Sequence, residues 1–356
     1  MENIQNQVNL APYNTFGVPC LAKEFFVLRT PSDLKEISKL NRPFFLGLGA
    51  NTLFVSPVYD GLVIKNELKG RRILSESNQE VILEVASGEN WIDLVNWVVE
   101  NGWSGIENLA YIPGSVGAAP IQNLAAYGQN FGETVVSVTG LNLETKKIET
   151  LSYADCHLYY RDSIFKHELK NKFIITSIKF KLSKVPKFDT RYYGSRPYES
   201  LQGEIDKIAP PPYTPKIIAQ AVTNQRKINL PDWKKLGTTG SFFKNPFVTK
   251  KRYGELSKEI KRLQMYPINK MLYPNPNDPV LKMTDVVKIP AGRLLDELGW
   301  RGKRIGQVGT FEKHALVVVN YGGATGQEIL DFASQMRQDL NNHFAIDLEP
   351  EVNIIK

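Results

Sequence analysis

The sequence predicts an α+β protein made of two packed subdomains and a third α+β domain beyond a proline-rich hinge. Three observations indicate this organisation. The chain has 356 residues, which is enough for two or three domains. Short strand-like and helix-like segments alternate on both sides of the run APPPYTP at residues 209–215. Four of the seven residues in that run are prolines, so we expect it to be a linker.

The first subdomain is predicted to span residues 1–70. Ser32 can cap a helix that carries Leu34, Ile37 and Leu40 on one face. The stretch FFLGLGANTLFV then gives two short apolar runs, predicted to be strands, around a glycine turn.

The second subdomain is predicted over residues 71–215. Glu80–Ala86 alternates as a strand does, and Asn90 can cap a helix that Asn101-Gly102 ends. One face of that helix is apolar: Trp91, Leu94, Val95 and Val98.

The remainder of this subdomain begins with residues 102–132, which are too rich in glycine and other small residues for a regular element. A hairpin is predicted around residues 144–147, and the run KFIITSIKFKL predicts another strand. Tyrosines and arginines then dominate an insertion at residues 183–215.

The third domain is predicted over residues 216–345. Thr214-Pro215 begins its first helix, and the run ALVVVN is typical of a buried strand. That strand lies between the helical segment AGRLLDELG and a helix that opens with a capping box, Thr325 to Glu328. The final stretch AIDLEPEVNII alternates polar and apolar residues, which predicts a last strand over residues 346–356.

The composition excludes several classes of protein. No apolar run approaches the roughly 20 residues of a membrane span, and the N-terminus lacks the basic and apolar parts of an export signal. Cys20 and Cys156 are too few for a disulfide framework, and four scattered histidines predict no metal site. We therefore expect a reduced, cytoplasmic protein.

The net charge of +7, from 44 Lys and Arg against 37 Asp and Glu, suits an anionic partner. The basic residues are spread along the chain, with no arginine-rich arm and no basic–aromatic stripe. We therefore expect an anionic small molecule as partner and no nucleic acid.

Two loops of small residues can come close to a ligand. The first contains Gly47, Gly49, Asn51 and Thr52, and glycine amides of this kind can face phosphate oxygens. The second is IPGSVGAAPIQN at residues 112–123, whose path two prolines constrain. Either loop alone is also typical of an ordinary turn or Ω-loop. The pair leaves a diphosphate-binding cradle and a purely structural role equally open.

Three further stretches carry reactive groups. Arg161 lies between aromatic residues and Asp162, so its planar guanidinium can bind a carboxylate or pair with that aspartate. The run LEPEV places two acids on either side of a proline near the C-terminus. An acidic pair in such a position is usually solvated. In GSFFKNP, Ser241 precedes two phenylalanines. This pattern suits a core strand that ends at a turn, or a hydroxyl held in a dry site as a proton donor.

Eight motifs occur in a fixed order along the chain: NTFG, LGLGANTLF, GENW, IENLAYIPGSVGAAPIQN with AYG, YYRDSIFK, GSFFKNP, KIPAGRLLDELG with RIG, and LEPEV. Together they resemble the UDP-N-acetylenolpyruvoylglucosamine reductase family, flavoenzymes that make UDP-N-acetylmuramate for bacterial peptidoglycan. The resemblance runs over residues 11–356. It implies an FAD-binding fold of the vanillyl-alcohol-oxidase (PCMH) type in the first two subdomains. It also implies a C-terminal α+β substrate-binding domain, with residues 346–356 returning to the active site.

The resemblance also implies the ligands and the residues that hold them. FAD would be non-covalent, because neither loop contains a histidine or cysteine, and would contact Gly47, Gly49, Asn51, Thr52, Gly114, Ser115, Gly117 and Asn123. The substrate is the enolpyruvyl ether of UDP-N-acetylglucosamine, and it would contact Tyr127, Tyr160, Tyr193, Lys244 and Asn245. Tyr193 lies in Tyr192-Tyr193-Gly194, which resembles the tyrosine loop of one subtype. We expect the protein to be a monomer.

The implied reaction has two halves. NADPH gives a hydride to FAD and its product leaves, and the substrate then enters and receives the hydride at its vinyl methylene carbon. Arg161 and Glu351 match the residues that polarise the substrate carboxylate as negative charge develops. Ser241 matches the donor that protonates the adjacent carbon, with Lys244 as a cation that can help. Phe242 and Phe243 would keep solvent away.

Two features depart from the family pattern. Asn229 stands where the family has a diphosphate-binding lysine, so Lys227 or another base would replace it. Thr238-Thr239 precede Gly240 in place of asparagine and alanine. Two other functions stay open: a flavin oxidase of the same fold that acts on an alcohol or hydroxy acid, and a flavin-free protein that binds anions or nucleic acid.

Overall fold

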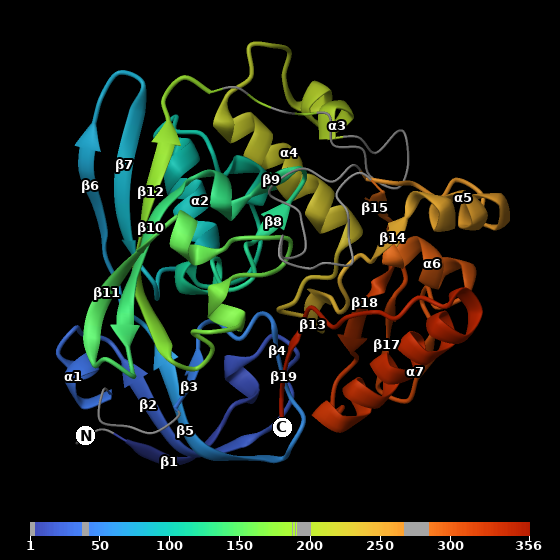
Figure 1. Ribbon diagram of the computed structural model, residues 1–356, viewed down its shortest axis with the longest axis horizontal. Helices are drawn as coiled ribbons and strands as arrows, with labels where there is room; N and C mark the ends of the chain where they lie inside the picture. Colours follow the sequence, from blue (N-terminus) through green and yellow to red (C-terminus); the bar gives the residue numbers. More distant parts are fainter. Residues whose placement is uncertain (1–3, 38–42, 187, 189, 191–200, 267–284) are drawn as a thin grey trace. The chain divides into compact units, whose positions relative to one another are not determined.

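The chain folds into two units, and neither is continuous in sequence. The first unit contains residues 1–7, 23–48 and 60–228, and the second contains residues 8–22, 49–59 and 229–356. The computed structural model describes all residues except 1–3, 38–42, 187, 189, 191–200 and 267–284 (Figure 1). The four-part division predicted from the sequence is finer than these two units and stays a prediction.

A four-stranded sheet in the order β1-β2-β5-β3 has most of its residues in the first unit (Figure 1). Its strands are β1 (Gln5–Asn9), β2 (Leu21–Leu28), β3 (Phe44–Leu46) and β5 (Val58–Asn66). The predicted helix is α1 (Asp33–Ile37), whose Leu34 and Ile37 are buried in the same apolar cluster as Leu28 of β2. Leu40 lies outside the described residues. The predicted apolar runs around the glycine turn are confirmed as β3 and as β4 (Thr52–Phe54).

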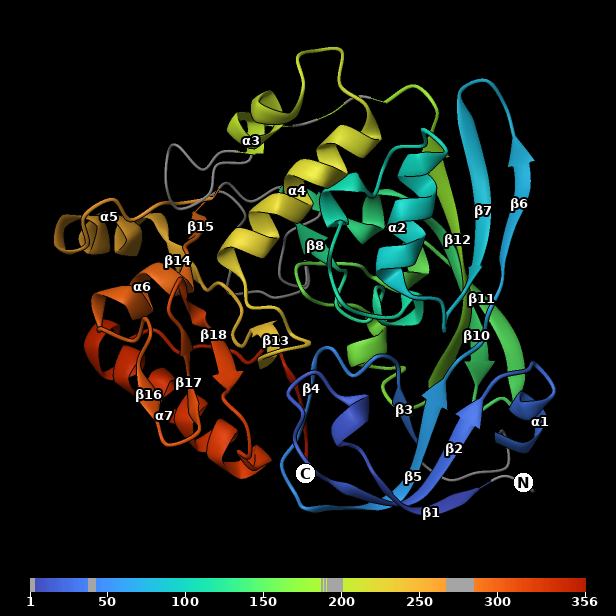
Figure 2. The same ribbon diagram turned by 180° about the vertical axis from the view of Figure 1, so that it is seen from behind.

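A fully antiparallel five-stranded sheet in the order β11-β10-β12-β7-β6 forms the other part of the first unit (Figure 2). Its strands are β6 (Arg71–Glu76), β7 (Glu80–Ala86), β10 (Val135–Asn142), β11 (Lys147–Ser152) and β12 (Phe173–Ser183). The predicted strand over residues 80–86, the hairpin and the strand that follows it are all confirmed.

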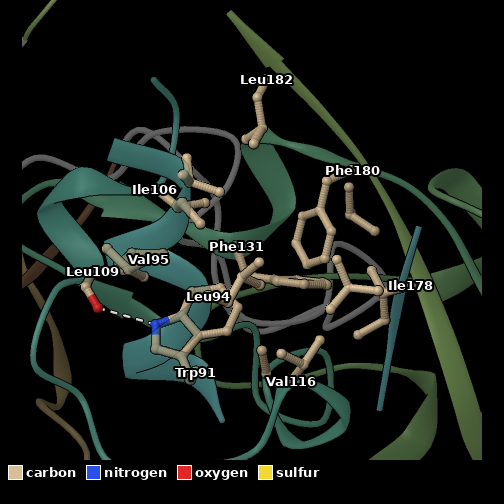
Figure 3. Packing of buried hydrophobic residues seen from close by; sticks show 14 of the residues in the cluster. Trp91, Leu94, Val95, Ile106, Leu109, Val116, Phe131, Ile178, Phe180 and Leu182 are labelled. Carbon is tan, nitrogen blue, oxygen red and sulfur yellow. Dashed lines mark hydrogen bonds between the residues drawn. The ribbon is translucent and has the colours of Figure 1, made fainter. Parts of the chain in front are cut away.

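The helix α2 (Trp91–Glu100) packs its apolar face against this sheet. The indole of Trp91 lies among Val116, Phe131 and Phe180, and its Nε1 donates a 3.0 Å hydrogen bond to Leu109 O (Figure 3). The rings of Phe131 and Phe180 meet edge to face, with centroids 5.7 Å apart. A residue that combines a large apolar surface with one satisfied N–H group suits the centre of such a core.

The predicted cap of α2 is confirmed. Asn90 Oδ1 accepts hydrogen bonds from Ile92 N at 2.8 Å and from Asp93 N at 3.3 Å. Asn90→Ala is therefore expected to lower the free energy of unfolding by about 1 kcal/mol, because two amide groups at the helix start lose their acceptor. Chemical denaturation measures this change. Asn90→Asp, which keeps an acceptor, should remain close to the wild type, and an equal loss in both variants would contradict the capping role.

Residues 102–132 lack long regular elements, as the sequence predicts. They hold three single-turn 3₁₀ helices and a two-residue strand pair, β8 (Ala125–Ala126) with β9 (Gln129–Asn130). Beyond the five-stranded sheet, α3 (Leu201–Ile208) was not predicted, whereas α4 (Pro215–Asn229) begins at the predicted proline. The buried residues Ile218 and Val222 of α4 join the α2 core.

The second unit is built on a sheet in the order β13-β18-β17-β16 (Figure 2). Its strands are β13 (Gly237–Ser241), β16 (Arg304–Ile305), β17 (Val308–Phe311) and β18 (His314–Asn320), and a separate pair joins β14 (Phe247–Thr249) to β15 (Val286–Lys288). The α-helices in its described residues are α5 (Lys250–Glu259), α6 (Ala291–Glu297) and α7 (Gly326–Phe344). The predicted capping box is confirmed, with Thr325 Oγ1 accepting from Glu328 N at 3.2 Å.

The predicted C-terminal strand is wrong for most of its length. Only β19 (Asn353–Ile355) forms, parallel to β4. Burial does alternate before it, with Ile346 and Leu348 inside. However, Ala345 adopts a left-handed conformation with φ of 51°, and Pro350 makes only an isolated antiparallel bridge to Phe243. The alternation therefore reflects packing of an extended segment and not a continuous strand.

None of the helices in the described part of the chain combines the length and the apolar character that crossing a bilayer requires. Cys20 and Cys156 are both buried free thiols. Burial raises the pKa of the Cys156 thiol to about 12, so that thiol is unreactive at neutral pH.

Candidate flavin and substrate site

The predicted site residues divide between the two units. The first unit holds Gly47, Gly114, Ser115, Gly117, Asn123, Tyr127, Tyr160 and Arg161. The second unit holds Gly49, Asn51, Thr52, Ser241, Lys244, Asn245 and Glu351. Tyr193, and with it the tyrosine loop predicted at residues 192–194, lies outside the residues that the structure describes.

In the first unit, the loop over residues 114–117 runs beside the segment 87–91. Backbone hydrogen bonds join the two: Trp91 N to Gly114 O at 3.0 Å, Val116 N to Glu89 O at 2.9 Å and Gly117 N to Ser87 O at 2.8 Å. A Cβ atom on Gly117 would lie 2.6 Å from Ser87 Cβ, so only glycine fits there. These hydrogen bonds and this close contact therefore hold the loop directly against the segment 87–91.

The two predicted glycine loops meet inside the first unit. A Cβ atom on Gly47 would lie 2.3 Å from Ser115 Oγ, which places the end of the first loop against the second. At Gly114 the structure has no heavy atom within 4 Å of the corresponding position, so this part of the loop has an open side. Close backbone packing on one side and open space on the other fit a diphosphate or flavin that approaches the main chain.

Three predicted ligand residues of the first unit have a left-handed backbone. The φ angles are 44° at Asn123, 48° at Tyr127 and 53° at Arg161. Such angles are uncommon outside glycine and gather at functional sites. The side chain of Asn123 supports the local fold, because Nδ2 donates to Tyr159 O at 3.0 Å and Oδ1 accepts from Gly132 N at 2.9 Å.

Arg226 is a further charged residue of this region, and it is absent from the set predicted from the sequence. Its Nε donates a 2.9 Å hydrogen bond to Tyr111 O. Burial lowers the pKa of Arg226, and the nearby cation of Arg161 lowers it further, while Tyr127 acts in the opposite direction. The Nε and Nη1 atoms of Arg161 are themselves shielded from solvent. Two shielded guanidinium groups that repel each other suit an anionic ligand.

A sequence signal for Arg226 did exist. The position is eight residues after Ile218 and four after Val222, which puts it on the buried face of α4. A basic residue on an apolar helix face is a candidate for a shielded binding group. Lys227 follows it, with Nζ 5.3 Å from the ring centroid of Tyr111.

In the second unit, the glycine turn lies against an N-terminal segment. Gly49 has φ of 65°, and a Cβ atom there would lie 2.0 Å from Tyr13 O and 2.8 Å from Asn14 Cα. Asn51 follows, with Nδ2 donating a 3.0 Å hydrogen bond to Glu351 O. Thr52 pairs with Asn353 in the parallel β4–β19 ladder. The turn and the C-terminal acid are thus held together.

Ser241 also lies beside the Glu351 segment. Ser241 ends β13, and the next residue donates from Phe242 N to Leu316 O at 2.9 Å. Phe242 O in turn accepts from Glu351 N at 2.8 Å. The side chains of Phe242 and Phe243 are buried, as expected of residues that exclude water. The structure therefore brings the predicted proton donor and the predicted acid into adjacent segments.

Three residues close to Ser241 in sequence differ in how their polar groups are paired within the described structure. Lys244 Nζ forms a 2.5 Å ion pair with Glu349, and Asn245 Oδ1 accepts from Ala291 N at 3.0 Å at the start of α6. Thr239 Oγ1, in contrast, is buried and has no hydrogen-bond partner among the described residues. A buried hydroxyl without a partner is unfavourable, so a ligand atom is a natural partner for it.

Comparisons with known proteins bear on the family and the fold of this chain. Residues 25–151 match the family model described as FAD binding domain, and residues 232–355 match that described as UDP-N-acetylenolpyruvoylglucosamine reductase, C-terminal domain. Among solved structures, the UDP-N-acetylenolpyruvylglucosamine reductase of Thermus caldophilus aligns with a TM-score of 0.67 at 20% identity, over 99% of each chain. A solvent-stable cholesterol oxidase aligns with a TM-score of 0.52 at 9% identity, over 98% of this chain and 86% of the other. These alignments confirm the predicted FAD-binding fold of the vanillyl-alcohol-oxidase type.

Two curated relatives are much more similar in sequence. The UDP-N-acetylenolpyruvoylglucosamine reductase of Flavobacterium johnsoniae is 39% identical over 355 residues, which is 99% of each chain. That of Bdellovibrio bacteriovorus is 38% identical over 354 residues, or 98% of each chain. Identity at this level along the whole length means that the chain belongs to the UDP-N-acetylenolpyruvoylglucosamine reductase family.

Proposed function

We propose that this protein reduces the enolpyruvyl ether of UDP-N-acetylglucosamine to UDP-N-acetylmuramate, with NADPH as the source of the hydride and FAD as its carrier. The observation that carries the proposal is the hydrogen bond between Phe242 O and Glu351 N, which joins the segments of the predicted proton donor and the predicted acid. Family membership over the full length of the chain supports the substrate and the reaction. We also propose that the enzyme acts as a monomer, which sedimentation measurements would test.

FAD, when bound, supplies the chemistry of taking a hydride from NADPH and passing it to the substrate. The residues that would hold it in the first unit are Gly47, Gly114, Ser115, Gly117 and Asn123, and those in the second unit are Gly49, Asn51 and Thr52. The open side of Gly114 and the close packing at Gly47 and Gly117 fit such a ligand. Backbone amides bind an anionic group best where no side chain blocks its approach to the main chain.

The substrate carboxylate would be bound by Arg161 and Glu351. A guanidinium can donate two parallel hydrogen bonds to a carboxylate. Negative charge that develops next to that carboxylate is then stabilised by groups already in position. Glu351 would lie beside that charge as a hydrogen-bonding partner. The remaining proposed contacts of the substrate are Tyr127, Tyr160, Lys244, Asn245 and Tyr193, the last of which lies outside the described residues. Lys227 is the proposed replacement for the family lysine.

The proton would come from Ser241 Oγ. A serine hydroxyl is a weak acid in water, so it needs an adjacent charge and a dry setting. Lys244 follows three residues later as a cation, and the buried Phe242 and Phe243 limit the access of water. Protonation from a fixed hydroxyl also sets the configuration of the new stereocentre, which solvent would leave undefined.

The proposal is tested by separating the two halves of the reaction without oxygen. NADPH should bleach the flavin absorbance of the purified protein, and the enolpyruvyl substrate should then restore it rapidly. Bleaching without recovery would mean that a different compound accepts the electrons. A preparation that contains no flavin and binds none would contradict the proposed function.

A further inference from the structure

The proposed FAD-binding loop at residues 114–117 is held in part by a neighbouring segment of the chain. Backbone hydrogen bonds join the loop to Ser87, Glu89 and Trp91, so the loop runs alongside the segment 87–91. Whatever fixes this segment therefore also fixes the loop. Ser87 is tied on its other side, with its N–H donating to Thr176 O at 2.9 Å and its Oγ accepting from Asn66 Nδ2 at 2.8 Å.

Glu89 is the charged residue at the centre of this segment. Its backbone O accepts from Val116 of the loop, and its side chain points to the turn that precedes β6. Oε1 accepts from Gly70 N at 2.9 Å, and Oε2 accepts from Arg71 Nε at 3.2 Å and from Arg71 Nη2 at 2.9 Å. One residue thus connects the loop to the 70–71 turn.

Several neighbours confine the Arg71–Glu89 pair. The side chain of Arg71 is 24% exposed and that of Glu89 is 11% exposed, so solvent screens the pair only weakly. Arg71 also lies 5.8 Å from the ring centroid of Trp97 and donates from Nη1 to Asp93 O at 3.3 Å. Lys69 donates from Nζ to Gly88 O at 2.7 Å, which adds a second cation beside the segment.

The charge state of Glu89 agrees with this geometry. Burial alone would raise the pKa of the carboxyl group. The hydrogen bonds from Gly70 and Arg71, and the cations of Arg71 and Lys69, outweigh that effect and hold the pKa below its usual value. Glu89 is therefore ionised at neutral pH, and the pair is a charge-assisted contact.

We propose that Glu89 is a positioning residue for FAD: its carboxylate, fixed by Gly70 N and by Arg71, sets the backbone that holds the loop at residues 114–117. This inference rests on the proposed FAD site. Glu89 itself touches no ligand in this scheme. Its effect reaches FAD through the bond between Glu89 O and Val116 N.

The test is the FAD affinity of folded apoprotein, measured from the quenching of FAD fluorescence well below the melting temperature. Glu89→Gln keeps the size of the side chain and an acceptor for Gly70, but it removes the charge that holds Arg71. FAD should bind about tenfold more weakly. At saturating FAD, turnover should return and the KM for the enolpyruvyl substrate should stay unchanged.

The chain offers a matched control in the neighbouring ion pair. This pair is Arg72 with Glu84, which face each other in the register of β6 and β7. Arg72 is 72% exposed, and the pair lies outside the segment 87–91 that bonds to the loop. Glu84→Gln should change FAD affinity by no more than about twofold.

Three outcomes would decide the matter. A lower melting temperature of Glu89→Gln with unchanged FAD affinity would overturn the inference, because the pair would then serve stability alone. If Glu89→Gln fails to fold, Arg71→Gln takes its place, because it leaves Glu89 the hydrogen bond from Gly70 N. Unchanged FAD affinity of Arg71→Gln in the same assay would then overturn the inference. A wild-type protein that binds no FAD would instead contradict the proposed function.

Discussion

Ser241→Ala should strongly slow the second half of the reaction and leave the first half intact. NADPH should still bleach the flavin at close to the wild-type rate, because no proton from Ser241 is needed for that step. Recovery of absorbance after addition of the enolpyruvyl substrate should be slower by a factor of about 10² to 10⁴, the usual contribution of a positioned acid. Anaerobic stopped-flow spectroscopy measures both rates in one preparation.

The control for this variant is another serine of the second unit. Ser334 lies in α7, where its Oγ donates to Leu330 O at 2.7 Å, and it has no proposed role in the reaction. Ser334→Ala should leave both half-reactions near their wild-type rates. If Ser241→Ala slowed bleaching and recovery equally, the hydroxyl would serve flavin binding or local structure, and its assignment as proton donor would be wrong.

Local features of the sequence predicted the elements of the first unit well. Glu80–Ala86 and α2 appear where alternation, helical spacing and the Asn90 cap placed them. In each case the sequence pattern lies within the element that it predicts, or in the residues next to it. The prediction therefore needs no knowledge of contacts with distant segments. The glycine loops were found for the same reason, since their small residues are consecutive in sequence.

Contacts between distant segments could not be predicted in this way. The C-terminal segment alternates like a strand, yet its ladder to β4 covers only Asn353–Ile355, and Pro350 makes an isolated bridge to the distant Phe243. Lys244 was predicted to act on the substrate, and its ion pair with Glu349 connects segments about a hundred residues apart. The bonds of Glu89 likewise depend on the 70–71 turn and the 114–117 loop coming together, which no local pattern encodes.

Gly49→Ala should destabilise the second unit more than an alanine at any other described glycine of that unit with a positive φ angle. A left-handed alanine costs about 1 to 2 kcal/mol by itself. The new Cβ atom would also lie 2.0 Å from Tyr13 O, a backbone atom that can move only with its chain. Overpacking of this kind typically costs a further 1 to 3 kcal/mol or so. The free energy of unfolding should therefore fall by about 2 to 5 kcal/mol, as chemical denaturation would measure.

Gly299→Ala separates the two causes, because Gly299 lies in the same unit with a similar φ of 74° and has no heavy atom within 4 Å of the added Cβ. This variant should lose only the conformational cost of about 1 to 2 kcal/mol. The difference between the two variants then measures the clash with Tyr13. Because Gly49 precedes Asn51, whose side chain bonds to Glu351 O, the clash should also weaken FAD retention in Gly49→Ala and not in Gly299→Ala. Equal losses of stability in the two variants would mean that the turn moves freely, and that its close packing against Tyr13 does not constrain the site.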